Sequence, residues 1–350
     1  MKKEFTINGP VGELHGVIHK CPDEFEGGNV MIMCHGFRGS MEGGGRAAQL
    51  AEEISERFAT VVRFNFTRCA KLSVLVEELK AVIDYARKEL DPEYLILLGR
   101  SFGGATCLVT ACADEKYRPD GLCLWSTPHS LSQTFDSIFD TVSHDAFTLA
   151  LTENKDILMD DEMGRDLVTA DFVQDLFRYD LGKLIRNWQE GALLVIHAEN
   201  DEYVPLQDAK KNYALAGGED KKMYVMPGDD HHLNLCWGVA GELVKRWIAK
   251  ERYAWGASVW PSSTECEGEA GQNMQRVDSL FHQIEGIAWD FCRKLPDKSG
   301  TAEYLQRVRQ VAELYNSAKE AKAFAVPENT KPVEDCLTKI LHKLTQLPIL

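Results

Sequence analysis

Hydrophobic residues follow two alternating patterns along the first 250 positions. Short apolar or alternating runs predict strands over residues 4–8, 13–19, 29–34, 60–66, 94–99, 121–126, 192–198 and 222–228. Apolar residues at a period near 3.6 predict helices over residues 45–58, 71–90, 101–113 and 206–218. The first two strands are expected to pair antiparallel, and the later alternation of strand and helix is typical of a parallel, doubly wound sheet. We therefore predict an α/β fold with a mostly parallel sheet.

This alternation is interrupted once and then stops. Residues 127–190 carry helical patterns of their own between two core strands, which predicts a cap inserted into a core of residues 1–126 and 191–250. Residues 255–273 are rich in Gly, Ser, Pro and Glu and predict a linker. Helical patterns over residues 274–295, 301–324 and 333–347 make residues 251–350 a linker followed by an all-helical extension. The extension is expected to complete the cap or to form a homodimer contact.

Composition narrows the class of protein. The chain has 54 acidic and 39 basic residues and a net charge of −15, so we expect no nucleic-acid partner. No apolar run approaches the roughly 20 residues of a membrane helix, and no apolar segment follows the two N-terminal lysines. A soluble, cytoplasmic protein without membrane contact is the expectation. The ten cysteines include no CxxC pair and are expected to be reduced and mostly buried, which argues against structural zinc.

The segment "LGRSFGGA", residues 98–105, places a serine between a predicted strand and a predicted helix. Gly99 and Gly103 flank Ser101 in a G-x-S-x-G pattern, which is typical of a nucleophile elbow because only glycine fits such a tight turn. The backbone N–H of Phe102 would lie at a helix N-terminus, where it could bind an oxyanion. The second oxyanion donor is expected after the strand at 29–34, at the N–H of Phe37.

A serine nucleophile needs a base and an acid, in the chain order Ser, acid, His on this architecture. Asp201 follows the strand at 192–198, and His231 follows the strand at 222–228. Because parallel strands end at one edge of the sheet, we expect both loops to meet the loop of Ser101 there. His231 would then act as the general base, and Asp201 would orient it.

Other residues compete for these roles. Glu199 or Glu202 could be the acid, with Asp201 only capping the helix near residue 206, and His232 could be the base. Asp229, Asp230, His231 and His232 could bind a metal, but neighbours along a chain rarely converge on one ion. His35 is expected to shape its loop through ring hydrogen bonds rather than act as a base. Aromatic cap residues could line an apolar pocket, but are expected to fill the core of the cap: Phe135, Phe139, Phe147, Phe172, Phe177, Tyr179 and Trp188.

Four segments together resemble the α/β-hydrolase fold, and most closely its cinnamoyl or feruloyl esterase-like branch: "HGF", "GRSFGG", "HAENDEYVP" and "GDDHHL". The resemblance spans about residues 4–250 and implies an esterase with a cap over the site and no cofactor or metal. It assigns the nucleophile to Ser101, the acid to Asp201, the base to His231, and the oxyanion amides to Phe37 and Phe102. The chain departs from the family at Arg100, where His is frequent, and residues 61–73 lack the glycine-rich turn.

The sequence therefore predicts a serine esterase whose substrate is a small-molecule ester with a small or medium acyl group or an aromatic acid. One alternative is an acylaminoacyl or dipeptidyl-type serine peptidase, for which Arg178 and Arg186 in the cap could hold a peptide terminus. The other is a receptor or scaffold without catalysis on the same fold.

Overall fold

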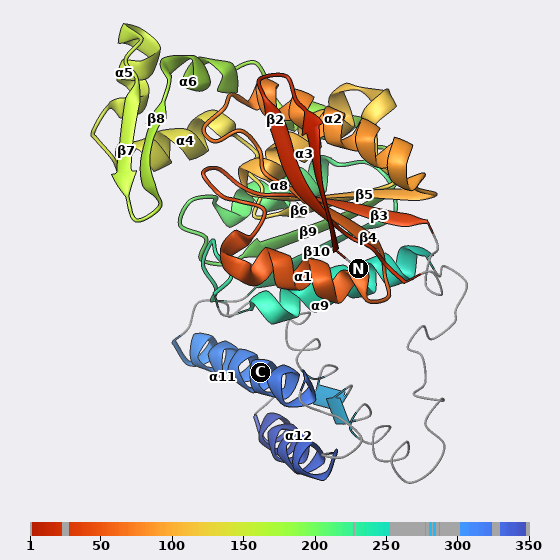
Figure 1. Ribbon diagram of the computed structural model, residues 1–350. Coiled ribbons are helices and arrows are strands. Elements are labelled where there is room, and N and C mark those ends of the chain that lie inside the picture. The colour runs from red at the N-terminus through yellow and green to blue at the C-terminus, as the bar shows by residue number, and fades with distance from the viewer. Residues whose placement is uncertain are drawn as a thin grey trace. The chain divides into compact units, whose positions relative to one another are not determined.

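The computed structural model describes residues 2–22, 28–226, 228–234, 236–252, 277, 280, 281, 283, 284, 287, 302–323 and 330–347. Its main feature there is an eight-stranded sheet in the order β1-β2-β4-β3-β5-β6-β9-β10 (Figure 1). The strands are β1 (Lys2–Asn8), β2 (Glu13–His19), β3 (Asn29–Cys34), β4 (Thr60–Phe64), β5 (Tyr94–Arg100), β6 (Gly121–Trp125), β9 (Ala192–Ala198) and β10 (Lys221–Met226). All eight strands predicted from the sequence are confirmed.

The strand register makes most of this sheet parallel. β1 pairs antiparallel with β2, and β2 pairs antiparallel with β4. The pairs β3–β4, β3–β5, β5–β6 and β6–β9 are parallel. Every residue of β3, β4, β6 and β9 is buried, as expected for parallel strands with both faces covered. The predicted α/β fold class is therefore confirmed.

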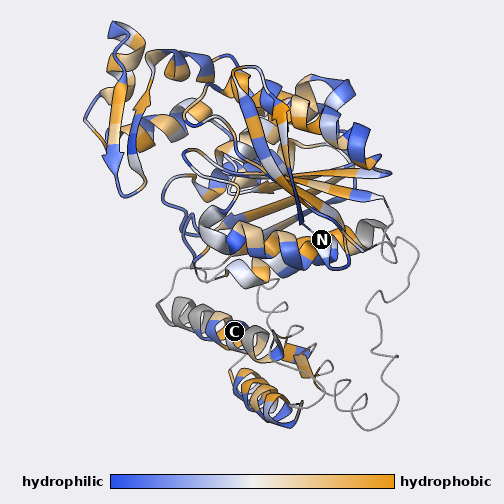
Figure 2. Ribbon diagram, in the orientation of Figure 1, coloured by the Kyte–Doolittle hydropathy of each residue, from blue (hydrophilic) through white to orange (hydrophobic). Residues whose placement is uncertain are grey.

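Helices at the predicted places cover the sheet. They are α1 (Arg46–Ser55), α2 (Leu72–Leu90), α3 (Phe102–Ala113) and α8 (Leu206–Leu215). In Figure 1, α2 and α3 lie on one face of the sheet and α1 lies on the other. α2 buries an apolar stripe that includes Leu75, Leu79, Val82 and Ala86, spaced three to four positions apart. In Figure 2 the central strands beneath these helices are largely orange, the colour of hydrophobic residues.

The segment predicted to form a cap, residues 127–190, lies between β6 and β9. It contains α4 (Leu131–Asp140), α5 (Ala146–Glu153), β7 (Ile157–Asp161), β8 (Gly164–Val168), α6 (Ala170–Leu176) and α7 (Leu181–Leu184). The helical patterns predicted here are confirmed, whereas the antiparallel hairpin of β7 and β8 was not predicted. Short 3₁₀ turns complete the list at Gly43–Gly45, Glu115–Tyr117 and Ile185–Asn187.

The chain divides into two compact units. One contains Met1–His197 and Asp201–Met223, and the other contains Ala198–Asn200 and Tyr224–Leu350. The second unit includes α9 (Trp237–Arg252), α11 (Ala302–Ala323) and α12 (Thr330–Thr345), and the last two match predicted helices. The predicted linker and most of the helix predicted at 274–295 lie outside the described residues. The domain boundaries expected from the sequence stay a prediction.

Two further observations concern the described part of the chain only. None of its helices combines the length and the apolarity that a bilayer crossing needs. Its cysteines are free thiols, and all of them except Cys69 and Cys336 are buried.

Candidate active site

Ser101 forms the apex of a tight turn between β5 and α3. Its backbone has φ 53° and ψ −121°, a conformation that is strained for any residue other than glycine. The Ser101 N–H donates to the carbonyl of Trp125 at the end of β6 (2.8 Å), and the Ser101 carbonyl accepts from Gly104 N–H (2.9 Å). The elbow geometry predicted from "GRSFGG" is therefore present.

The glycines around Ser101 are required by close backbone approach. A Cβ on Gly99 would collide with the carbonyl oxygen of Gly103. A Cβ on Gly103 would collide with the carbonyl oxygens of Cys34, at the end of β3, and of His35, in the loop that follows. The G-x-S-x-G spacing thus lets the strand, the helix and the neighbouring loop meet at one point.

His35 holds the loop after β3 in place. Its Nδ1 donates to the carbonyl of Gly36 (2.9 Å), and its Nε2 accepts from the N–H of Phe66 (3.0 Å). These partners fix a neutral ring with the proton on Nδ1, and burial lowers the pKa of His35 in the same sense. The predicted loop-shaping role of His35 is confirmed.

The same contacts orient the N–H of Phe37. Gly36 C=O and Phe37 N–H belong to one planar trans peptide and point in opposite directions. The Gly36 oxygen accepts from both His35 and Gly39 N–H (3.0 Å), so the direction of the Phe37 N–H is fixed from behind. A Cβ on Gly36 would lie 3.7 Å from Ser101 Oγ, which places this peptide beside the serine. The structure therefore brings together Ser101 and the loop of Phe37.

Aromatic residues of the predicted cap form a packed cluster that reaches this loop. The ring centroid of Phe135 lies 5.1 Å from that of Phe37 and 5.0 Å from that of Phe102. Phe172 joins the same cluster, 5.1 Å from Phe135. Phe135, Phe139, Phe147, Phe172 and Trp188 are at most 7 % exposed, whereas Phe177 is 56 % exposed. The interpretation that cap aromatics fill a core is confirmed for the five buried rings.

Asp201 lies in the loop between β9 and α8 with a fully buried side chain. Its Oδ1 accepts from the N–H groups of Tyr203 (3.1 Å) and Val204 (2.8 Å), and its Oδ2 lies 3.5 Å from His197 Nε2. Pro205 is the N-cap of α8, so the idea that Asp201 only caps this helix is wrong. Two turn amides hold the carboxylate in a defined direction.

His231 lies in the loop between β10 and α9 and is 7 % exposed, whereas its neighbour His232 is exposed. Two carboxylates shape this loop. Asp229 accepts from the backbone N–H of Asp230 (3.0 Å) and of Cys236 (2.6 Å). Burial alone would raise the pKa of Asp230, but hydrogen bonds from Asn234 and His232 lower it. In the described chain, no group of three or more His, Cys, Asp and Glu side chains is arranged to hold a metal ion.

The start of the loop that carries Asp201 is bonded to the start of the loop that carries His231. Asn200 N–H donates to the Asp229 carbonyl (3.0 Å), and Glu199 N–H donates to the Met226 carbonyl (2.9 Å). The Glu199 carboxylate accepts from Gly228 N–H (2.9 Å), so this side chain also links the beginnings of the two loops. Ser101 and Asp201 belong to one compact unit and His231 to the other, and the catalytic triad stays a prediction.

Comparison with known protein sequences finds distant relatives of this chain. No protein-family model matches the chain. Two curated relatives, both described as "Uncharacterized protein YfhR", come from Salmonella typhimurium and Salmonella typhi. Each is 27% identical over 162 residues, which are 44% of this chain and 47% of the relative. The chain thus spans about half the length of the curated relatives it matches.

Comparison with solved structures gives a clearer result. Est1E from Butyrivibrio proteoclasticus is 19% identical with a TM-score of 0.56, over 72% of this chain and 99% of Est1E. XC6422 from Xanthomonas campestris, described as an a/b serine hydrolase without lid, is 19% identical with a TM-score of 0.51, over 71% and 94%. The alpha/beta hydrolase GrgF from Penicillium sp. sh18 is 14% identical with a TM-score of 0.55, over 73% and 100%. The eight-stranded sheet and these likenesses lead to one conclusion: the chain has the α/β-hydrolase fold.

Proposed function

We propose that the chain is a serine hydrolase that cleaves carboxylic esters through an acyl-enzyme on Ser101. The observation that carries this proposal is the strained backbone of Ser101 at the strand-to-helix turn. Such strain costs stability, on the order of 1–3 kcal/mol, and is found where a side chain must be held in a functional direction. A receptor or scaffold would gain nothing from it.

In this mechanism Ser101 Oγ attacks the ester carbonyl carbon while His231 takes its proton. The tetrahedral intermediate collapses, the bond to the leaving alcohol breaks, and His231 returns the proton to that alcohol. Water then attacks the acyl-enzyme with the same help and releases the acid. Asp201 orients His231, and the two turn amides that hold its Oδ1 support this role.

Two backbone N–H groups would stabilise the negative oxygen of the intermediate. Phe102 N–H is the first amide of α3, and a helix leaves its first N–H groups without helical partners. Phe37 N–H has the fixed direction described above. Both proposed donors are backbone groups, so no side chain has to be reoriented to supply them in the transition state.

The substrate we propose is an ester of a small or medium acyl group or of an aromatic acid. The structural neighbour Est1E is described with ferulic acid bound, which supports aromatic esters as the first to test. The peptidase alternative gains no support from the cap. Arg178, one of its two candidate anchors, pairs with the buried carboxylate of Asp175 (3.2 Å).

The test begins with a fluorophosphonate probe, which reacts only with an activated serine. We expect the full chain to be labelled and the Ser101→Ala variant to stay unlabelled. Hydrolysis of p-nitrophenyl esters of increasing acyl length, of methyl ferulate and of aminoacyl amides then separates esterase from peptidase. Equal labelling of the two proteins would remove Ser101 as nucleophile, and faster cleavage of the amides would favour the peptidase.

A further inference from the structure

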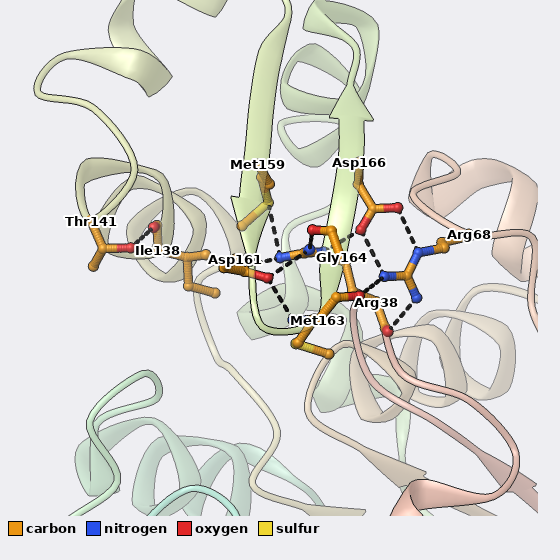
Figure 3. A network of polar contacts seen from close by, with 9 residues as sticks. All are labelled: Arg38, Arg68, Ile138, Thr141, Met159, Asp161, Met163, Gly164 and Asp166. Carbon is orange, nitrogen blue, oxygen red and sulfur yellow. Dashed lines mark hydrogen bonds and ion pairs between the residues drawn. The ribbon is translucent and has the colours of Figure 1, made fainter.

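The hairpin of β7 and β8 in the cap is bonded to the loop that carries Phe37. Arg38, the next residue, donates from Nε to Asp166 (2.5 Å) and from both terminal nitrogens to Asp161 (2.6 and 2.9 Å). It also donates to the Gly164 carbonyl (2.6 Å). Figure 3 shows this guanidinium enclosed by the two strands and the turn of the hairpin.

A second arginine completes the connection. Arg68 donates to both oxygens of Asp166 (2.5 and 2.7 Å) and to the Met163 carbonyl (2.8 Å). It donates as well to the carbonyl of Arg38 itself (2.8 Å), so the backbone after Phe37 is also fixed (Figure 3). We call Arg38, Arg68, Asp161 and Asp166 the arginine clamp.

Burial makes this clamp an obligatory part of the folded state. The Arg38 side chain is 2% exposed and that of Asp166 is 10% exposed. A guanidinium out of water is stable only when its charge and donors are matched, so Arg38 cannot lose its aspartates without moving. Its backbone is also left-handed, with φ 56°, a conformation that its surroundings must impose.

Both packing and polar contacts hold the loop. The Phe37 ring packs against Phe135, whereas a small pocket beside the loop is lined by residues 35–39, residues 66–70, Leu75 and Phe102. On the side of the hairpin, Arg38 holds the loop through its hydrogen bonds to Asp161, Asp166 and Gly164.

We propose that Arg38 is a positioning residue through which the cap hairpin, together with the contacts of His35 and Gly39 to the Gly36 carbonyl, sets the direction of the Phe37 N–H in the oxyanion site. This inference rests on the proposed serine hydrolase activity. Three backbone bonds separate Arg38 N from Phe37 N, so a shift of the backbone at Arg38 reaches the oxyanion donor through a single residue. A change in the position of the hairpin would therefore change how well the transition state is stabilised. Binding of the ground-state ester would not depend on the hairpin in this way.

The experiment compares carboxamide variants on one hairpin. D161N/D166N removes both negative charges from the clamp, and D160N is the matched control because Asp160 is 68% exposed and pairs only loosely with Arg165 (3.9 Å). For p-nitrophenyl esters we expect D161N/D166N to lower kcat by roughly 10- to 100-fold, with KM changed less than about threefold. The rate of fluorophosphonate labelling should fall in parallel, and D160N should behave as the wild type.

Two further variants keep the test decisive if the double variant does not fold. The Asp161 side chain is 45% exposed, so D161N alone disturbs the core little and should give a smaller loss of kcat. R38K keeps the charge but loses the forked geometry, and should also lower kcat without raising KM.

The outcomes separate this inference from the proposed function. If the wild type reacts and the clamp variants lose thermal stability but keep kcat and labelling rate, the clamp is purely structural and the inference is wrong while the hydrolase proposal stands. If the wild type is as unreactive as Ser101→Ala, both fall together.

Discussion

At the scale of single residues, the site depends on where side chains are absent. Gly103 belongs to the elbow and Gly36 to the neighbouring loop, and an added Cβ would have very different space at the two positions. A Cβ on Gly103 would collide with two backbone oxygens that cannot move away. A Cβ on Gly36 would lie 3.2 Å from both Ser101 Cβ and the Arg100 carbonyl, and 3.7 Å from Ser101 Oγ. Glycine at position 103 is needed for the fold, and glycine at position 36 leaves space around the Ser101 hydroxyl.

This difference predicts opposite effects of the same substitution. We expect Gly36→Ala to fold and to lower the rate of fluorophosphonate labelling by roughly tenfold or more, since the added methyl crowds the attacking oxygen. Gly103→Ala should instead lose most of its folded protein. The control is Gly12→Ala, because a Cβ there meets nothing within 4 Å. Thermal melts and labelling rates of the three variants measure this, and a normal labelling rate in Gly36→Ala would contradict it.

A second residue-scale prediction concerns pH. His19 is 1% exposed and accepts a hydrogen bond from Arg63 Nε (3.1 Å). Burial and the charge of Arg63 lower the pKa of His19 from 6.5 to about 4. Between these two pH values, His19 is protonated in the unfolded chain but neutral in the folded chain. The free energy of unfolding is therefore highest above pH 6.5, where His19 is neutral in both states, and it decreases as the pH falls towards 4.

We expect this loss to reach about 3 kcal/mol of unfolding free energy. Urea denaturation of the wild type and of His19→Gln between pH 4.5 and 7.5 measures it. Glutamine keeps a hydrogen-bond acceptor but does not titrate, so the variant should depend less on pH. His35, whose pKa burial also lowers, is present in both proteins and cancels in the comparison. Parallel curves for the two proteins would show that His19 does not cause the dependence.

At the scale of elements, the sequence predicted the sheet well and the cap only in part. The central strands are continuous apolar runs bounded by turn residues, which is the pattern of strands buried on both faces. β7 and β8 have a different pattern. Leu158 and Leu167 pair across the hairpin and are 45% and 55% exposed, so apolar residues occupy both faces and alternation is blurred. Tertiary contacts, not local pattern, stabilise this hairpin.

The candidate site likewise has parts that the sequence predicted and parts that it did not. The elbow, the His35 loop and the loops of Asp201 and His231 follow from short motifs at strand ends, which a sequence displays directly. The arginine clamp joins Arg38 to carboxylates 123 and 128 positions later. Nothing in "HGFRGS" marks its arginine for such a partner, since the need for an opposite charge arises only once the residue is buried.

At the scale of the whole molecule, the second compact unit contains α9 together with the C-terminal helices α11 and α12. α9 contacts α11, and α11 contacts α12. Each of these helices buries apolar residues at helical spacing, among them Val244 and Trp247 in α9, Val311 and Tyr315 in α11, and Leu337 and Leu344 in α12. Because α9 shares this core, the helical extension is expected to support the folded state of the unit rather than fold apart from it.

Truncation tests this support. A chain that ends at residue 252 keeps α9 but loses α11 and α12, which uncovers apolar side chains worth about 1.5–3 kcal/mol each when fully buried. We expect its melting temperature to fall by about 5–10 °C, or the chain to aggregate. A chain that ends at Thr345 keeps α12 and should melt as the full chain does. Light scattering on the same samples tests the predicted homodimer, because removal of α11 and α12 should change the measured mass from that of two full chains to that of one truncated chain. If the chain ending at residue 252 keeps both its melting temperature and its native mass, the extension neither stabilises the unit nor joins two copies.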